Sequence, residues 1–307
     1  MEMHRFKANL KGWIGLSRPP FHTVGVLPFL LGSFLAWKIV GLFSNAVFIL
    51  GVLAVILILL STYHAVEYFD HEEDKISKKL FHSRFAGGSG VIPSGILSRQ
   101  VPLWTSLITF TLAAVIGFIL QIIIKTGPYT LILGCLGAFP GFFYSTRPVR
   151  LVERGVGEIF IGFCYGWLPV ASGFYIQTGY ITPLIHLMGI PIGLTIVNVI
   201  LLNEFQDFVA DSAVGKRNIL VRLGKKKGKT LYIIISMLAW ITMIISITAG
   251  IPIKAIYFYL PVLILSAAIA VMMVKKKFED PKILEIMCGL NIAVNLGTTM
   301  TYIFAYM

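Results

Sequence analysis

The sequence predicts an all-α, polytopic membrane protein with nine transmembrane helices around a central cavity. Of its 307 residues, 57% are hydrophobic and only 13% are charged, whereas a soluble domain carries about 25% charged residues. Nine apolar stretches approach the roughly 20 residues that a helix needs to cross a bilayer. Two acidic clusters lie at the ends of two of these stretches, which indicates a polar site at one side of the membrane.

The apolar stretches follow one another along the whole chain, so we expect a single domain over residues 1–307. Before the first stretch, basic residues alternate with Leu10 and Trp13, which fits either an amphipathic interfacial helix or an unstructured basic tail. The fourth stretch contains glycines and Pro140, which spanning helices tolerate where neighbouring helices pack closely. The expected helices cover residues 21–41, 45–69, 101–124, 128–145, 155–177, 183–205, 229–250, 254–274 and 284–306.

Charge asymmetry predicts the orientation in the cytoplasmic membrane. All but three of the 26 Lys and Arg residues lie on the side that holds the N-terminus, and the exceptions are Lys38, Lys125 and Lys254. The positive-inside rule then makes the N-terminus cytoplasmic, and an odd number of helices places Met307 outside. All 14 acids lie on the cytoplasmic side, so we expect the active site there. Because this rule explains the net charge of +12, no nucleic-acid partner is expected.

The two acidic clusters have the same spacing. The first contains Glu67, Asp70 and Asp74, and the second reads Asn203-Glu204-Phe205-Gln206-Asp207-Phe208-Val209-Ala210-Asp211. Residues three and four apart share a helix face, so each set of carboxylates points one way. The same offset separates Asp70 from Asp207 and Asp74 from Asp211. This offset predicts two parallel four-helix repeats plus one helix, with the clusters on opposite walls of the cavity.

Oxygen ligands of this kind suit a hard cation such as Mg²⁺, with Mn²⁺ as an alternative. Two polar loops, 70–100 and 206–229, are expected to cap the site. They contain Arg84-Phe85-Ala86-Gly87-Gly88-Ser89-Gly90 and Gly215-Lys216-Arg217. Glycine lets backbone amides approach an anion, and Lys or Arg supplies positive charge. Acidic and basic clusters side by side favour an anion that is bound both through a metal and by cationic side chains. A diphosphate is the anion that most requires both kinds of contact.

The run from Asn203 to Gly224 resembles the second aspartate motif of the UbiA superfamily of intramembrane aromatic prenyltransferases. Its Gly-Lys-Arg segment is similar to the 1,4-dihydroxy-2-naphthoate branch of the menaquinone pathway, as are residues 87–90, 144–148 and 155–158. The first cluster departs from the family form N-D-x-x-D-x-x-x-D. Val66 stands at the asparagine and Glu67 at the first aspartate. Glutamate can still ligate a cation, whereas valine cannot.

The resemblance implies Mg²⁺-dependent transfer of a prenyl chain from a polyprenyl diphosphate, through an allylic carbocation, to an aromatic quinone precursor. Alternatives are a non-aromatic acceptor such as a glycerol-phosphate lipid backbone, a cation-binding membrane transporter, and a non-catalytic isoprenoid-binding protein. A transport pathway would need polar residues across the bilayer, and the acids lie on one side only. The expected partners are the diphosphate donor, a small acceptor and membrane lipid, with no obligate protein partner.

The resemblance also assigns roles to residues of both clusters and both loops. The catalytic residues are Asp70, Asp74, Asp207 and Asp211. The metal ligands are Glu67, Asp70, Asp74, Asn203, Asp207 and Asp211. The diphosphate-binding residues are Arg84, Arg147, Lys216 and Arg217. The aromatic side chains that line the cavity and face the carbocation are Tyr63, Tyr68, Tyr144 and Tyr165.

Overall fold

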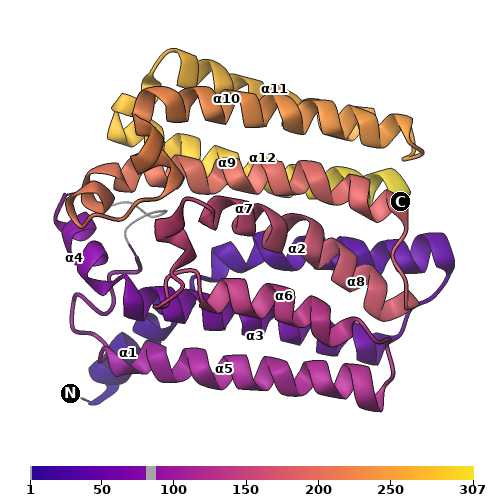
Figure 1. Cartoon of the computed structure of the whole chain (residues 1–307), viewed down its shortest axis with the longest axis horizontal. Coiled ribbons are helices and arrows are strands. Elements are labelled where there is room, and N and C mark those ends of the chain that lie inside the picture. Colours follow the sequence, from indigo (N-terminus) through magenta and orange to yellow (C-terminus); the bar gives the residue numbers. More distant parts are fainter. Residues whose placement is uncertain (1, 81–87) are drawn as a thin grey trace.

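The structure is a computed structural model that describes residues 2–80 and 88–307. Over these ranges it is built of helices and contains no strand. The long helices lie side by side along the longest axis of the molecule, and the two chain termini are at opposite ends (Figure 1). Within the same ranges, eight helices are long and apolar enough to cross a membrane.

The helices follow the predicted order. The first half contains α1 (Glu2–Ser17), α2 (Pro19–Leu35) with the π-helical turn η1 (Ala36–Val40), α3 (Asn45–Phe69), α4 (His71–Leu80), α5 (Gln100–Phe118) with η2 (Ile119–Ile123), and α6 (Thr130–Phe142). The middle contains η3 (Leu151–Arg154), α7 (Gly157–Gly162), η4 (Phe163–Trp167) and α8 (Leu168–Thr178). The second half contains α9 (Pro183–Ala213), α10 (Ile219–Thr248), α11 (Ala255–Val274), η5 (Lys277–Glu279) and α12 (Pro281–Tyr306).

Three boundaries differ from the predicted spans in ways that matter for the site. α9 continues past residue 205 to Ala213, so the second acidic cluster lies on the helix itself. α10 begins at Ile219, because Asn218 caps it, and is kinked at Gly224, where φ is 75°. The expected fourth span is realised as α6, which has 13 residues. At 1.5 Å per residue α6 is about 20 Å long, shorter than the roughly 30 Å hydrocarbon core.

Close backbone contacts hold the helices around the centre of the bundle. A Cβ atom on Gly166 in η4 would lie 2.3 Å from the Cα atom of Gly193 in α9. A Cβ atom on Gly173 in α8 would lie 2.2 Å from the carbonyl oxygen of Phe29 in α2. Small residues at such crossings let membrane helices approach closely. The segment from α7 to α8 is therefore packed tightly between α2 and α9.

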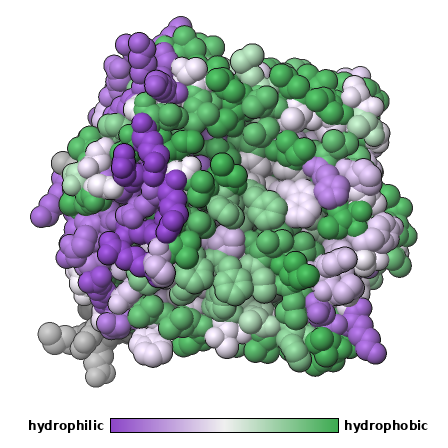
Figure 2. Space-filling view, in the orientation of Figure 1, coloured by the Kyte–Doolittle hydropathy of each residue, from purple (hydrophilic) through white to green (hydrophobic). Residues whose placement is uncertain are grey.

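The outer face is apolar along most of the bundle. Figure 2 shows hydrophilic side chains gathered at the end that carries the N-terminus and α4, while hydrophobic side chains cover most of the remaining face. Exposed apolar residues such as Ile49, Trp104, Ile244 and Ile264 are spread over α3, α5, α10 and α11. Contact between water and an apolar surface of this extent is unfavourable, so the surface indicates contact with lipid. The protein is accordingly a membrane protein with one polar end.

Candidate active site

A cavity of about 200 Å³ opens at the polar end of the bundle, and both acidic clusters line it. Asp70 and Asp74 come from the junction of α3 and α4, and Asn203, Asp207 and Asp211 come from the last turns of α9. The two sets therefore form two walls of one cavity. We call them the α3–α4 wall and the α9 wall.

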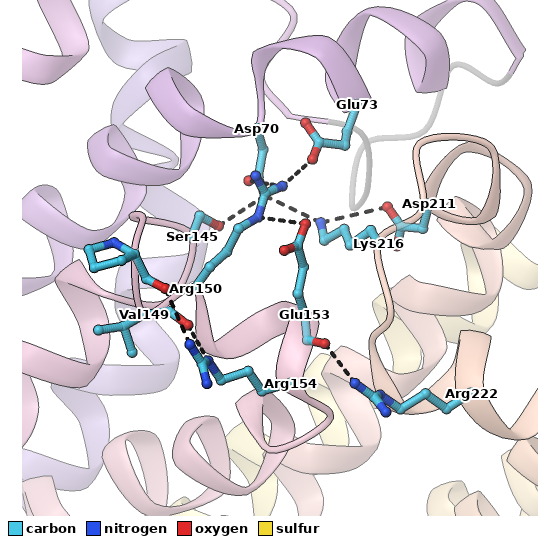
Figure 3. Close-up of polar contacts among 11 residues, drawn as sticks. Asp70, Glu73, Ser145, Val149, Arg150, Glu153, Arg154, Asp211, Lys216 and Arg222 are labelled. Atoms are coloured by element: carbon cyan, nitrogen blue, oxygen red, sulfur yellow. Dashed lines mark hydrogen bonds and ion pairs between the residues drawn. The ribbon is translucent and has the colours of Figure 1, made fainter.

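Lys216 connects the two walls. Its Nζ atom lies 3.2 Å from Oδ2 of Asp70 and 3.6 Å from Oδ1 of Asp211 (Figure 3). Asn218 orients the same loop, because its Nδ2 donates to Oδ2 of Asp211 at 2.8 Å and its Oδ1 accepts from the amide of Val221. Burial lowers the pKa of Lys216, but the two carboxylates outweigh it and the net pKa is raised. Lys216 is therefore a fixed positive charge between the walls.

Arg150 organises the α3–α4 wall and was missed in the sequence prediction. Its Nη2 donates to Asp70 and forms a close ion pair with Glu73, and its Nε lies 2.9 Å from Glu153 (Figure 3). Ser145 donates to the other oxygen of Asp70 at 2.9 Å. Burial lowers the pKa of Arg150, but its acidic neighbours outweigh it and raise the net value. The only feature of the sequence that pointed to Arg150 was the arginine-rich segment 147–154, which ends in η3.

Glu67, an expected metal ligand, is not among the residues that line the cavity. Its Oε1 accepts from Nε and Nη2 of Arg18, at 3.2 and 2.8 Å, and from the backbone amide of Ser89 at 2.6 Å. Its Oε2 accepts from the hydroxyl of Ser89 at 2.8 Å. Both oxygens are thus bound by protein donors. Arg18, which Glu67 holds, does line the cavity.

Several buried oxygens face the cavity without a protein hydrogen-bond partner. They are Oδ2 of Asp74, Oδ1 of Asn203 and both carboxylate oxygens of Glu204. Burial and the neighbouring carboxylates of Glu67 and Asp70 raise the pKa of Asp74. Buried polar atoms normally have partners, so this group of oxygens indicates a place for a ligand.

Three of the four predicted tyrosines line the cavity, namely Tyr63, Tyr144 and Tyr165. The hydroxyl of Tyr165 donates to that of Tyr63 at 3.1 Å, which in turn donates to the carbonyl of Phe21. Tyr68 is not among the lining residues. Its ring instead stacks under the guanidinium of Arg99, whose Cζ is 5.2 Å from the ring centroid. The structure thus places Tyr68 outside the set of aromatic side chains that line this cavity.

Of the basic residues predicted to bind diphosphate, only Lys216 lines the cavity among those that the structure describes. Arg147 and Arg217 are exposed and are not among its lining residues. Arg150, three residues after Arg147, is buried and pairs with Asp70 and Glu73. Arg84 lies outside the described residues.

A second, apolar chamber of about 130 Å³ extends from the first into the bundle. The two share Thr62, Gly141, Cys164 and Tyr165 as lining residues. The walls of the second chamber come from α2, α3, α5, α6 and α8, and many of its lining positions are glycines. The site thus has a charged compartment joined to a hydrocarbon-like one, an arrangement that composition alone did not predict.

The residues fit a magnesium ion held partly by a substrate. In the part of the chain that the structure describes, no three His, Cys, Asp or Glu side chains are grouped so that they could hold a metal by themselves. Mg²⁺ is usually bound through one or two carboxylates, several waters and substrate phosphates, not by a complete protein cage. The oxygen-only ligands and the unpartnered atoms Asn203 Oδ1 and Asp74 Oδ2 match that mode.

Solved structures share the fold of this chain. A UbiA homologue from Aeropyrum pernix K1 aligns with a TM-score of 0.70 and 16% identity, covering 93% of this chain and 98% of the other. A UbiA homologue from Archaeoglobus fulgidus bound to GPP and Mg²⁺ aligns with a TM-score of 0.62 and 14% identity, covering 95% and 99% of the two chains.

Relatives of known name are similar in sequence. The 2-carboxy-1,4-naphthoquinone phytyltransferase of Synechocystis sp. is 26% identical over 225 residues, which are 72% of this chain and 69% of that one. The 1,4-dihydroxy-2-naphthoate octaprenyltransferase of Bacillus subtilis is 26% identical over 216 residues, covering 70% and 67%. The model of the UbiA prenyltransferase family matches residues 25–287, a range that contains both acidic walls and Lys216. The chain therefore belongs to the UbiA prenyltransferase family.

Proposed function

We propose that the protein transfers a prenyl chain from a polyprenyl diphosphate to an aromatic quinone precursor. The observation that carries this proposal is the joined pair of compartments. A diphosphate fits the charged cavity between the two acidic walls, and a hydrocarbon tail fits the apolar chamber behind it. Few molecules other than an isoprenoid diphosphate need both.

The donor would be oriented by the cationic groups at the cavity. Lys216 and Arg18 line the charged compartment and would contact the diphosphate oxygens, while Asp70 and Asp211 keep Lys216 in place. The candidate metal ligands that line the cavity are Asp70, Asp74, Asn203, Asp207 and Asp211. When bound, Mg²⁺ would neutralise the diphosphate charge and make it a better leaving group.

In the proposed reaction the C–O bond between the prenyl chain and the diphosphate breaks, and the diphosphate leaves with the electron pair. Tyr165 lines both compartments, and Tyr63, whose hydroxyl it contacts, lines the charged one, so their rings could stabilise the allylic cation by cation–π contact. The apolar chamber would exclude the water that could otherwise trap the cation. The acceptor's nucleophilic carbon then forms the new bond and loses a proton.

The acceptor is argued from Glu204 and from the relatives. Both oxygens of Glu204 face the cavity without a partner, so a neutral acceptor with hydroxyl groups could donate hydrogen bonds to them. The relatives in Bacillus subtilis and Escherichia coli are named 1,4-dihydroxy-2-naphthoate octaprenyltransferases, which favours a naphthoate.

The site is proposed to open on the cytoplasmic side of the cytoplasmic membrane. The polar end of the bundle carries both acidic walls and the N-terminus (Figures 1 and 2), and most of the basic residues are on that side of the sequence pattern. A transporter would need polar groups at the other end too, whereas the second chamber is lined mainly by apolar side chains.

An acceptor screen tests the proposal. Purified protein with Mg²⁺ and radiolabelled geranylgeranyl diphosphate is incubated with 1,4-dihydroxy-2-naphthoate, 4-hydroxybenzoate or geranylgeranylglyceryl phosphate. We expect a labelled lipid product with the naphthoate and none from Asp207→Asn protein. A product with the glycerol phosphate alone would overturn the acceptor, and intact donor in every reaction would overturn prenyl transfer.

A further inference from the structure

Two connections between helices meet at Asp70. The α6–α7 connection, residues 143–156, contains η3, and the α9–α10 connection consists of residues 214–218. Each supplies one cation, because Nη2 of Arg150 lies 3.4 Å from Oδ1 of Asp70 and Nζ of Lys216 lies 3.2 Å from Oδ2 (Figure 3). The placement of both cations therefore depends on how the two connections are held against each other.

Arg222 ties the two connections together. It lies near the start of α10, is exposed, and is not among the residues that line the cavity. Its Nη2 donates to the backbone carbonyl of Glu153 in η3 at 2.8 Å (Figure 3). Its Nε donates to the carbonyl of Arg217 in the α9–α10 connection at 2.6 Å. A guanidinium suits this task because its N–H groups point in fixed directions from one plane.

Glu153 transmits the hold of Arg222 to the acidic wall. Its carbonyl oxygen binds Arg222, while its carboxylate Oε1 lies 2.9 Å from Nε of Arg150. The contacts form a closed ring, which leads from Asp70 through Arg150 and Glu153 to Arg222. From Arg222 it returns through the α9–α10 connection and Lys216. A change at Arg222 should therefore reach both cations that contact Asp70.

The segment 155–158 is shaped to receive the start of α10. The φ angle of Gly155 is 71°, and a Cβ atom there would lie 2.8 Å from Nε of Arg222, so a larger residue would displace the guanidinium. Glu158 is 1% exposed, and its Oε1 accepts from the amide of Ile219 at 2.8 Å. This amide belongs to the first turn of α10 and has no partner within its own helix.

We infer that Arg222 is a positioning residue for prenyl transfer. It touches neither the donor nor the acceptor, but it holds the α6–α7 and α9–α10 connections together. Arg150 and Lys216 thereby approach the two oxygens of Asp70 at the same time, and the ammonium of Lys216 stays at the cavity. The inference rests on the proposed function, because it takes Lys216 as a contact of the donor's diphosphate.

Binding of inorganic diphosphate tests this role without turnover. Full-length protein in lipid nanodiscs with Mg²⁺ is titrated with inorganic diphosphate in a calorimeter. We expect Arg222→Gln to weaken binding at least fivefold, because Lys216 is no longer held in place. Lys226→Gln removes a positive charge from an exposed side chain four residues further along α10, and it should leave the affinity unchanged. Equal weakening in the two variants, or none in Arg222→Gln, would overturn the inference.

Kinetics separate positioning from a general loss of folded protein. With geranylgeranyl diphosphate and 1,4-dihydroxy-2-naphthoate, we expect Arg222→Gln to raise KM for the donor at least fivefold and to leave KM for the acceptor within twofold. Loss of folded protein lowers kcat and leaves both KM values as they are, and that result would overturn the inference. If Arg222→Gln does not fold, Arg222→Lys replaces it. A single ammonium does not reproduce the planar fork, so KM for the donor should still rise at least threefold.

A double-mutant cycle tests the contact between Gly155 and Arg222. Gly155→Ala should weaken diphosphate binding by displacing the guanidinium, so Arg222→Gln should add little to it. Gly179→Ala is the matched control, because Gly179 has a φ of 80° and nothing within 4 Å of the added Cβ. Arg222→Gln should keep its full effect beside Gly179→Ala. Additive losses from Gly155→Ala and Arg222→Gln would overturn the inference.

The outcomes also distinguish this inference from the proposed function. Weaker diphosphate binding in Arg222→Gln, with no prenyl transfer to any acceptor by the unaltered protein, would reject the proposed function and leave the role of Arg222. Normal prenyl transfer, with the same diphosphate affinity in Arg222→Gln as in the unaltered protein, would reject the inference alone.

Discussion

The backbone of Gly88 lies directly against the carboxylate of Asp74. A Cβ atom at residue 88 would stand 2.1 Å from Oδ2 of Asp74, and φ at Gly88 is 67°. The absence of a side chain at residue 88 therefore leaves room for the carboxylate of Asp74 at the cavity.

Gly88→Ala should displace Asp74 and reduce prenyl transfer by at least tenfold. Gly95→Ala is the matched control, because Gly95 has a similar φ of 71° but nothing within 4 Å of the added Cβ. Both variants carry the backbone cost of a left-handed alanine, about 1–2 kcal/mol. Equal activity of the two, measured as initial rate with radiolabelled donor, would contradict this assignment.

Removal of the metal or of its carboxylates should stop the reaction. We expect EDTA to abolish release of diphosphate from a prenyl diphosphate and Mg²⁺ to restore it. Asp207→Ala should lower the rate by at least 10²-fold, since a group that stabilises charge in the transition state contributes about that much. Turnover that persists in EDTA would reject the metal.

The depth of the apolar chamber should limit the length of the donor. Gly134 lines this chamber and has open space where a Cβ would be, so Gly134→Leu fills the chamber without displacing a neighbour. We expect a preference for shorter prenyl diphosphates, measured by competition between geranyl and longer donors. Cys135→Leu is the control, because Cys135 is exposed on α6 and does not line the chamber.

The pairing of Glu67 with Arg18 should contribute to stability. The side chain of Glu67 is 1% exposed and that of Arg18 is 20% exposed, so Glu67→Gln breaks a largely buried pair. Breaking such pairs costs up to 3–5 kcal/mol, and the partial exposure of Arg18 reduces the expected loss to about 2 kcal/mol. Thermal unfolding in detergent measures it. Glu72→Gln, at an exposed pair with Lys75, should leave the unfolding temperature unchanged.

The orientation is tested by cysteine labelling. In a chain without its three native cysteines, we place a single cysteine at Lys226, in the polar part of α10, or at Lys254, before α11. A membrane-impermeant maleimide added to intact cells should label Lys254→Cys, and Lys226→Cys should react only after the cells are opened. The reverse pattern would place the site on the outside.

The sequence was a good guide to the helices and to the acidic walls. Hydropathy determined α3 at both ends, and the spacing of Asp207 and Asp211 showed that they share a face. Hydropathy did not predict where α9 ends, because the acid-rich final turns are polar but remain helical. It also overestimated α6, since an apolar run does not distinguish a helix from the apolar turns that flank it.

The partners of the acids were harder to predict. Arg18 and Arg150 reach Glu67 and Asp70 from distant parts of the chain, and no local spacing relates them. The choice between Arg147 and Arg150 depends on a loop without regular periodicity. The second chamber arises where glycines of separate helices face each other, and the sequence alone marked Gly134 only as a weak point of a helix.

Asn218 performs two tasks that are usually separate. It caps the first turn of α10 through Val221 and binds the carboxylate of Asp211. A ligand that draws Asp211 towards itself must therefore either break that bond or move the first turn of α10 with it. The movement can end at Gly224, because its backbone is not helical. No neighbouring heavy atom lies within 4 Å of where a Cβ atom would be at this residue. Residues 218–224 thus form a short lever at the polar end of the bundle, and the remainder of α10 can stay still while the lever turns.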